Sequence, residues 1–238
     1  MKLRALLRFP APTILSIGIL AAAAISPYPQ AQAQTKAPAC DRACLENFVD
    51  LYMEALIAHK PAQLAIAPKA KNTEDGVQLI PGDGFWRTAM AKGSYRLFTA
   101  DTETGDVAFL GTMREVPANP VIVMIRLKVA NRQITEIENL VIRDAAAATN
   151  LENHGKPNEV FSTAIPATQR STRAALINTA NLYYAALQNN DGKAVPPFTD
   201  DCQRIQNGTQ TTNNPNANAP APAAAAGKGK GKGGPPSP

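Results

Sequence analysis

Two glutamates, Glu136 and Glu138, alternate with apolar residues in a regular stretch of the sequence. Residues two apart in a β-strand share a face, so both carboxylates would project from one side of the strand. A carboxylate on an apolar face is desolvated, which raises its pKa toward neutrality and suits it to proton transfer. We therefore predict Glu138 or Glu136 as a general base. The alternative is that both carboxylates face solvent and that Ile137 and Val141 form the packed side of the strand.

Hydroxyl and aromatic side chains elsewhere in the chain could complete such a site. Tyr95 and Thr112 could donate hydrogen bonds to a substrate oxygen, and we group Tyr95 with the catalytic candidates. Tyr52, His59 and Trp86 could form the walls of a pocket and bind a substrate together with Thr112. The alternative interpretation assigns Tyr52, His59 and Trp86 to an ordinary hydrophobic core.

Other chemistries lack the residues that they need. The chain has two histidines and three cysteines, without an HExxH or a CxxC motif, so we predict no metal site. The P-loop motif GxxxxGK[ST] and the nucleophile elbow GxSxG are absent. We predict no cofactor, and the reaction open to the glutamates would be that of a cofactor-independent lyase or isomerase on a small apolar or aromatic molecule.

The three cysteines can form one disulfide and leave one thiol free. Cysteines in an oxidising compartment tend to pair. We favour a bridge from Cys40 or Cys44 to Cys202, which would tie the C-terminal segment to the first helix. The alternative bridge, between Cys40 and Cys44, is strained if both residues lie in a regular helix.

The N-terminus predicts export. Residues 1–33 contain basic residues, an apolar run and the small-residue pattern Ala31-Gln32-Ala33, which together are typical of a cleaved secretory signal peptide. The apolar run, residues 14–25, is shorter than the roughly 20 residues that span a bilayer. We therefore expect a secreted or periplasmic protein. An uncleaved membrane anchor and a lipid anchor on Cys40 are the alternatives.

The formal net charge of +5 comes from the ends of the chain. Six cations lie in the predicted signal peptide or in a low-complexity tail, residues 213–238: Lys2, Arg4, Arg8, Lys228, Lys230 and Lys232. The 24 basic residues less these six leave 18 against 19 acidic residues, so the rest is near neutral. It lacks the basic surface that tracks phosphates, and we expect no nucleic-acid partner. The tail is predicted to be disordered, as a solvated appendage or as a weak contact to anionic surfaces through Lys228–Lys232.

The pattern of the body predicts one helix followed by strands. Apolar residues from Leu45 to Leu56 recur at helical spacing after Asp41, which can cap a helix that reaches His59. Four strand patterns follow, with short turns between them: residues 94–101, 106–116, 121–130 and 134–143. We expect an antiparallel meander with the helix packed on one face.

Turn lengths predict the pairing of these strands. A four-residue loop after Val116 sets Thr112 opposite Ile125, and a two-residue turn at residues 131–132 sets Ile125 opposite Glu138. Tyr95 would then join them in one row, and both glutamates would share a face with the apolar side of the third strand. A slip of one residue would reverse the faces.

A long helix, a short helix, a hairpin at Glu74-Asp75-Gly76 and a meander resemble the NTF2-like (SnoaL-like) α+β cone. The segment from Arg126 to Glu138 looks like the last hairpin of that family, and residues 81–86, Pro-Gly-Asp-Gly-Phe-Trp, look like its secreted, mostly uncharacterised branch. The resemblance covers residues 41–144. It implies a pocket between the concave sheet and the helices, which some members use for catalysis with an Asp or Glu and others for binding ligands or partners.

The second half of the chain echoes the first. Residues 182–187 resemble residues 51–56 at an offset of 131, and residues 206–208 resemble residues 74–76 at an offset of 132. We predict a partial second repeat over residues 168–212, whose helix must pack on the first unit or on another chain, as in a homodimer. The predicted organisation is a signal peptide (1–33), an NTF2-like domain (40–144), a linker (145–167), the partial repeat and the tail. The predicted function is that of an exported protein that binds a small apolar molecule or a partner, with the glutamate-based enzyme as the alternative.

Overall fold

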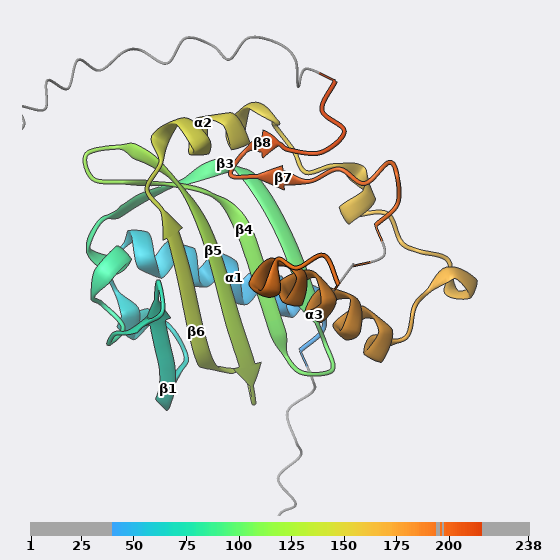
Figure 1. The fold of residues 1–238 in the computed structure, drawn as a ribbon. Coiled ribbons are helices and arrows are strands. Elements are labelled where there is room, and N and C mark those ends of the chain that lie inside the picture. Colours follow the sequence, from blue (N-terminus) through green and yellow to red (C-terminus); the bar gives the residue numbers. More distant parts are fainter. Residues whose placement is uncertain (1–39, 194–195, 197, 216–238) are drawn as a thin grey trace, which may run out of the picture. The chain divides into compact units, whose positions relative to one another are not determined.

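The computed structural model describes residues 40–193, 196 and 198–215 (Figure 1). The predicted signal peptide and residues 216–238 of the predicted tail lie outside the described residues. Within the described ranges, no helix has the length and apolar character needed to cross a membrane.

Helix α1 (Arg42–Ile57) begins where the sequence predicts it. The Asp41 carboxylate accepts a hydrogen bond from the backbone N–H of Cys44, which caps the helix. His59 lies beyond the end of the helix with a φ of 56° and is exposed, so the prediction that it belongs to the buried face of the helix is wrong. The left-handed backbone at this position turns the chain away from the helix axis.

Six strands form one curved sheet in the order β2-β1-β6-β5-β4-β3 (Figure 1). They are β1 (Ile66–Glu74), β2 (Val77–Gln78), β3 (Ala89–Asp101), β4 (Asp106–Glu115), β5 (Asn119–Ala130) and β6 (Gln133–Ile142). This confirms the predicted α+β class and the four-stranded meander. Strand β1 was not predicted as a strand, and because it pairs in parallel with β6 the sheet is mixed rather than antiparallel throughout.

Short 3₁₀ helices lie between these elements, at Pro61–Gln63 and Gly84–Arg87. The two-residue turn between β5 and β6 is confirmed. Asn131 and Arg132 both take left-handed conformations, with φ of 50° and 58°, as a type I′ hairpin requires.

The predicted register of β5 against β4 is wrong. Glu115 pairs with Asn119, so the loop holds three residues rather than four, and Thr112 pairs with Ile122 rather than Ile125. A shift by an odd number of residues reverses the face of the strand. The apolar side of β5 therefore lies beside Phe109 and Met113, not beside Thr112.

A bulge in β6 makes a second change of face. Val129 pairs with Ile134, whereas Lys128 pairs with Glu136, so Thr135 is the extra residue on β6. Beyond the bulge, Ile125 pairs with Asn139 rather than with the predicted Glu138. Asn139 then lies on the apolar face, and both glutamates lie on the other.

Helix α1 packs on the face formed by the apolar residues of β4, β5 and β6. This face holds the larger of the two clusters of buried apolar side chains. The fully buried members of this core with the largest side chains are Leu45, Tyr52, Met53, Leu56, Phe85, Trp86, Phe109, Met113, Ile125, Leu127 and Ile134.

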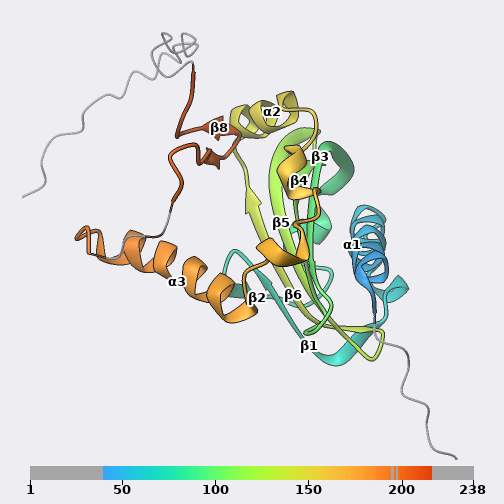
Figure 2. The ribbon, with the colours of Figure 1, turned by 90° about the vertical axis from the view of Figure 1, so that its right-hand side faces the viewer.

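Residues 145–153, which the sequence predicts as part of a linker, form helix α2 (Ala145–Asn153), capped by Asp144. This helix packs on the opposite face of the sheet from α1, against Tyr95 and Ile122 (Figure 2). Ala147 and Ala148 form much of the buried side of α2. Because alanine is only weakly hydrophobic, the amphipathic pattern of this helix is not evident in the sequence.

Helix α2 is tied to the sheet by the Glu152 carboxylate. Arg114 donates two hydrogen bonds to it, at 2.8 and 2.7 Å, and Thr112 donates a third at 2.8 Å. Charge-assisted, bidentate pairs of this kind hold a fixed geometry. The Arg114 guanidinium lowers the pKa of the Glu152 carboxyl below its ordinary range.

The second unit consists of α3 (Arg173–Asn189) and a hairpin of β7 (Ile205–Gln206) and β8 (Thr209–Gln210). None of the residues of α3 is buried. The hairpin contacts α2, since the backbone of Gly208 lies so close to Ala147 and Leu151 that a Cβ would meet their backbone atoms at 2.6 and 2.5 Å.

The disulfide joins Cys40 to Cys44, and Cys202 is free, so the favoured bridge to Cys202 is wrong. The strain expected of a bridge within a helix does not arise, because Cys40 precedes the cap residue Asp41 and lies outside the helix. The two Cα atoms are 5.3 Å apart, within the usual range for a disulfide.

We predict that Glu152→Gln lowers the free energy of unfolding at neutral pH by about 1–3 kcal/mol, because it removes hydrogen bonds to a charged partner. The pKa of Glu152 is lowered in the fold, so its stabilisation is present above the pKa of an unfolded glutamate and is lost as the pH falls through the folded value. Urea unfolding of wild type and variant from neutral to acidic pH should show a gap that closes in acid. The exposed Glu159→Gln is the control, and a gap of equal size in that variant would contradict the assignment.

Candidate functional site

The two glutamates of the predicted site lie on the sheet face opposite α1. Arg126, their neighbour on β5, donates to Glu136 at 2.6 Å, to Glu138 at 3.0 Å and to Asp106 at 2.7 Å. Their side chains are 34% and 49% exposed. Both carboxylates are paired with a guanidinium and open to water, and neither lies on the apolar face of the sheet where the sequence predicts them.

Tyr95 and Thr112 share that face but lie beneath α2. Tyr95 is 5% exposed and Thr112 is 1% exposed, and the Thr112 hydroxyl accepts from the Tyr95 backbone N–H and donates to Glu152. Thr112 lies in one row across the sheet with Ile122 and Ile142. Glu138 is four residues before Ile142 on β6, which is a separation of about 13 Å at the rise per residue of a strand. The structure therefore does not bring Tyr95, Thr112 and Glu138 together.

Three predicted binding residues do meet, at the end of α1. The rings of Tyr52 and Trp86 make an edge-to-face contact with centroids 5.2 Å apart. His59 shares a hydrogen bond with the Trp86 carbonyl oxygen through Nδ1. The Tyr52 hydroxyl accepts a hydrogen bond of 2.8 Å from the Asn139 side chain.

Two buried asparagines were missed by the sequence analysis, and one of them, Asn139, joins this polar cluster through Tyr52. Asn139 and Asn72 are 2% and 3% exposed, and the Oδ1 atoms of both, together with Nε1 of Trp86, have no hydrogen-bond partner among the described residues. Asn139 shares one face of β6 with Ile137 and Val141. It could have been recognised as a buried polar residue if the bulge in β6, which turns that face toward the core, had been known. Tyr52 and Trp86 belong to the hydrophobic core and are 0% and 1% exposed.

Burial raises the pKa of the Tyr52 hydroxyl well above its ordinary value. The Asn139 amide acts in the opposite direction, as does the Trp86 indole, which lies near the hydroxyl without hydrogen-bond geometry. Tyr52 therefore stays protonated at neutral pH and serves as a buried acceptor and packing residue.

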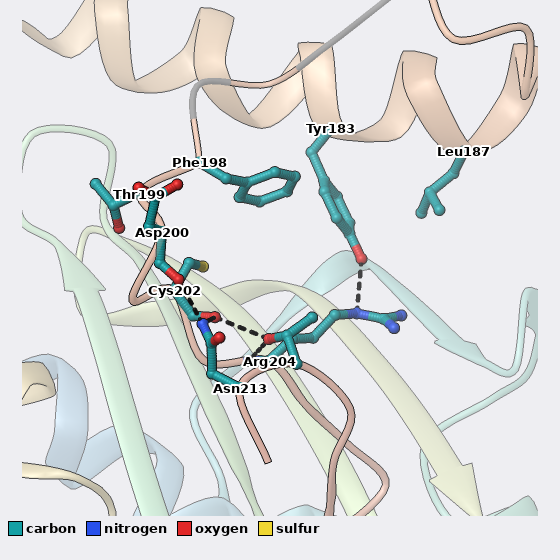
Figure 3. Close-up of a pocket in the computed structure, with 9 residues that line it drawn as sticks. Tyr183, Leu187, Phe198, Thr199, Asp200, Cys202, Arg204 and Asn213 are labelled. Carbon is teal, nitrogen blue, oxygen red and sulfur yellow. Dashed lines mark hydrogen bonds between the residues drawn. The ribbon is translucent and has the colours of Figure 1, made fainter. Parts of the chain in front are cut away.

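A cavity of about 370 Å³ lies in the second unit (Figure 3). Its walls come from α3 and from the segment that leads into and out of the β7–β8 hairpin: Tyr183, Leu187, Phe198, Thr199, Asp200, Cys202, Arg204, Thr212 and Asn213. The volume is within the range of pockets that hold small ligands. The sequence analysis did not find this site, although the repeated tyrosine at Tyr183 marks one wall of it.

Aromatic and basic groups face each other in this cavity. Tyr183 and Phe198 meet edge to face at 6.1 Å, and the Tyr183 hydroxyl accepts a hydrogen bond of 3.1 Å from Nε of Arg204 (Figure 3). Arg204 also donates to the Thr211 hydroxyl at 3.4 Å. Among the described carboxylates, none forms an ion pair with Arg204.

The described residues contain no group of three or more His, Cys, Asp or Glu side chains that could hold a metal ion. The free thiol of Cys202 and the carboxylate of Asp200 line the cavity, but no histidine does. Sulfur nucleophile chemistry of the Cys–His type therefore has no base within the cavity.

A family model described as a domain of unknown function (DUF8021) matches residues 169–234. The match starts at the second unit and covers less than half of the chain. No protein with a curated description matches the sequence.

Solved structures give distant similarities. A protein described as a candidate polyketide cyclase from Xanthomonas campestris pv. campestris is 19% identical, with 40% of this chain and 88% of that chain covered and a TM-score of 0.33. AclR, described as a candidate hydroxylase from Streptomyces galilaeus, is 10% identical, with 61% and 99% covered and a TM-score of 0.35. The α+β class of the present chain rests on its own elements and sheet order.

We predict that Tyr52→Phe changes the alkaline stability of the protein. The raised pKa of Tyr52 means that its stabilisation is present below the pKa of an unfolded tyrosine, about 10, and is lost as the pH rises through the folded value. The variant lacks this alkaline dependence, and it also leaves the Asn139 amide without its acceptor, at a cost of about 1–3 kcal/mol. Urea unfolding at increasing pH measures both effects. Tyr184→Phe, which alters an exposed tyrosine, should match wild type, and an unchanged alkaline slope in Tyr52→Phe would refute the assignment.

Proposed function

We propose that this chain is an exported binding protein whose cavity beneath α3 takes a small molecule with an apolar or aromatic body and an anionic group. The observation that carries the proposal is an aromatic-walled cavity with one guanidinium that has no carboxylate partner among the described residues.

The walls favour an apolar body. Tyr183, Phe198 and Leu187 present rings and a branched aliphatic chain, and Phe198 and Leu187 are about 60% exposed. A ligand of suitable size would remove this apolar surface from water, at about 25 cal/mol for each Å².

The polar end favours an anion. Tyr183 and Thr211 hold the Arg204 side chain in place, and a planar guanidinium binds a carboxylate through two parallel hydrogen bonds. Asp200, the other charged residue in the wall, lies on the side of the cavity away from the guanidinium (Figure 3). An aromatic or aliphatic carboxylate matches this arrangement.

The alternative, a lyase or isomerase with a glutamate base, has less support. Glu136 and Glu138 share Arg126 in an exposed cluster, and Tyr95 lies beneath α2 rather than beside them. Both carboxylates are therefore paired and open to water rather than lining an apolar pocket.

Export is part of the proposal. The Cys40–Cys44 disulfide supports it, because such bonds persist in oxidising compartments. The tail cations, Lys228–Lys232, fall outside the described residues, and their contact with anionic surfaces stays a prediction.

We predict that the wild-type protein binds 1-naphthoate more tightly than 1-naphthamide, and that Arg204→Ala removes this preference. Loss of a charge-assisted hydrogen bond of about 1.5–3 kcal/mol corresponds to a loss of roughly tenfold to a hundredfold in affinity for the acid. Isothermal titration calorimetry measures both ligands.

The matched control is Arg170→Ala, an exposed arginine in the same half of the chain that lies outside the cavity. It should bind the acid as the wild type does. Equal affinity of the wild type for acid and amide would reject the anionic subsite, and binding that survives Tyr183→Ala and Phe198→Ala together would reject the cavity.

A further inference from the structure

The turn between β7 and β8 carries the tripeptide Asn207-Gly208-Thr209. Elsewhere in the 238 residues, no asparagine is followed two positions later by serine or threonine. In exported proteins this pattern is the acceptor for N-linked oligosaccharides, provided that the residue in the middle is not proline and that the tripeptide lies at the surface. The structure decides whether the second condition is met.

Both residues that the pattern requires face solvent. Asn207 and Thr209 are exposed, whereas Gly208 between them is buried against α2 (Figure 1). The Gly208 carbonyl oxygen shares a hydrogen bond of 2.9 Å with Nε2 of His154. The glycine therefore fastens the turn to α2, and a large polar group on Asn207 can extend into solvent without breaking this contact.

The acceptor amide has no role inside the protein. Among the described residues, none forms a hydrogen bond with the side-chain amide of Asn207 or with the hydroxyl of Thr209. A sugar on Nδ2 replaces one hydrogen of that amide. Because no internal hydrogen bond is lost, the modified side chain leaves no buried polar group unpaired.

The equivalent turn of the first unit is engaged differently. Asp75-Gly76 has φ of 49° and 81°, against 48° and 77° for Asn207-Gly208, so the two turns have the same backbone. The Asp75 carboxylate accepts a hydrogen bond of 2.9 Å from the backbone N–H of Val141 on β6, and it lies 3.8 Å from the Arg143 guanidinium. In the described part of the second unit no strand takes the place of β6. The side chain at the turn is therefore free for a modification that the first unit could not accept.

The hairpin is short enough to open for an enzyme. Strands β7 and β8 form two residue pairs, Ile205 with Gln210 and Gln206 with Thr209. An isolated two-stranded hairpin is only marginally stable, and such elements open at a lower free energy than the whole fold. The tripeptide can therefore enter a transferase either before the hairpin packs on α2 or during a local opening.

We propose that Asn207 receives an N-linked oligosaccharide while the chain is exported. The proposal rests on the export that is part of the proposed function. Nδ2 of Asn207 forms a bond to the anomeric carbon of an oligosaccharide carried on a lipid diphosphate, and the bond from that carbon to the diphosphate oxygen breaks. Nδ2 gives up one proton and the lipid diphosphate leaves, so nothing is oxidised or reduced. The secretory pathway of the host supplies the donor and the transferase.

The oligosaccharide stands apart from the proposed small-molecule cavity. Neither Asn207 nor Thr209 lines that cavity. Glycosylation and the affinity for 1-naphthoate are therefore measured independently, and the loss of one does not imply the loss of the other.

Mass spectrometry of the full chain, secreted by a eukaryotic cell under its own leader, tests the proposal. Peptide N-glycanase releases N-linked oligosaccharides and leaves aspartate in place of the modified asparagine. We expect the secreted wild type to lose the mass of one oligosaccharide on this treatment and to show aspartate at position 207.

Four variants locate the acceptor. Thr209→Ala and Asn207→Asp should be secreted without the oligosaccharide, and Thr209→Ser should retain it because it keeps the hydroxyl. Aspartate suits the left-handed turn, as Asp75 does in the first unit, so Asn207→Asp is expected to fold. Asn190→Asp, at an exposed left-handed asparagine outside the pattern, is the matched control and should retain the oligosaccharide. Circular dichroism melts verify that each variant folds.

A second expression arm separates a failure of export from a failure of the acceptor. In it, residues 34–238 follow an established secretion leader. A chain that stays in the cell under its own leader but is modified at Asn207 in this arm contradicts export by its own leader and supports the acceptor. A chain that reaches the medium in either arm with Asn207 unmodified overturns the proposal, as does an oligosaccharide that persists in Thr209→Ala.

Discussion

The pairing of β5 with its neighbours is the constraint on which the rest of the structure depends. Successive side chains of a strand face opposite sides, so one loop residue and one bulge decide which residues form the core and which face solvent. The three-residue loop after Glu115 and the extra residue Thr135 together place the apolar sides of β4, β5 and β6 on one face, under α1. The same two features bring Asn139 to Tyr52 and turn Glu136 and Glu138 toward Arg126.

The two halves of the chain show how packing on a sheet changes the environment of two similar helices. In the first unit the stripe of α1 packs against four strands and an aromatic pair, and Tyr52 ends in a closed cluster with Asn139. In the second unit the equivalent Tyr183 meets Phe198 and Arg204 beside an open cavity. Among its described residues, the second unit has no strands equivalent to β3–β6. Helix positions that belong to the core in the first unit are therefore accessible in the second, where they can bind a ligand.

The proposed ligand site follows from this incomplete copy. The cavity uses the aromatic and basic groups that the hairpin segment folds back onto α3, in particular Phe198 and Arg204. Because α3 has no charged residue after Arg173, a ligand in the cavity does not have to desolvate an ion on this helix.

Local patterns in the sequence determined α1, the four meander strands, the Asn131-Arg132 turn and the presence of a second helix within residues 168–212, because each depends on nearby residues: a cap, a periodicity or a turn pair. They could not determine the faces, since the bulge at Thr135 has no signature beyond an ordinary threonine. They did not reveal β1, whose pairing with β6 joins residues far apart in the chain, or α2, whose buried side is made of alanines. Only the tertiary structure decided that Glu136 and Glu138 lie in an exposed ion-pair cluster, that Cys44 bonds to Cys40, and that the open cavity belongs to the second unit, because each of these depends on the groups that pack across the sheet or the helix rather than on the neighbouring residues along the chain.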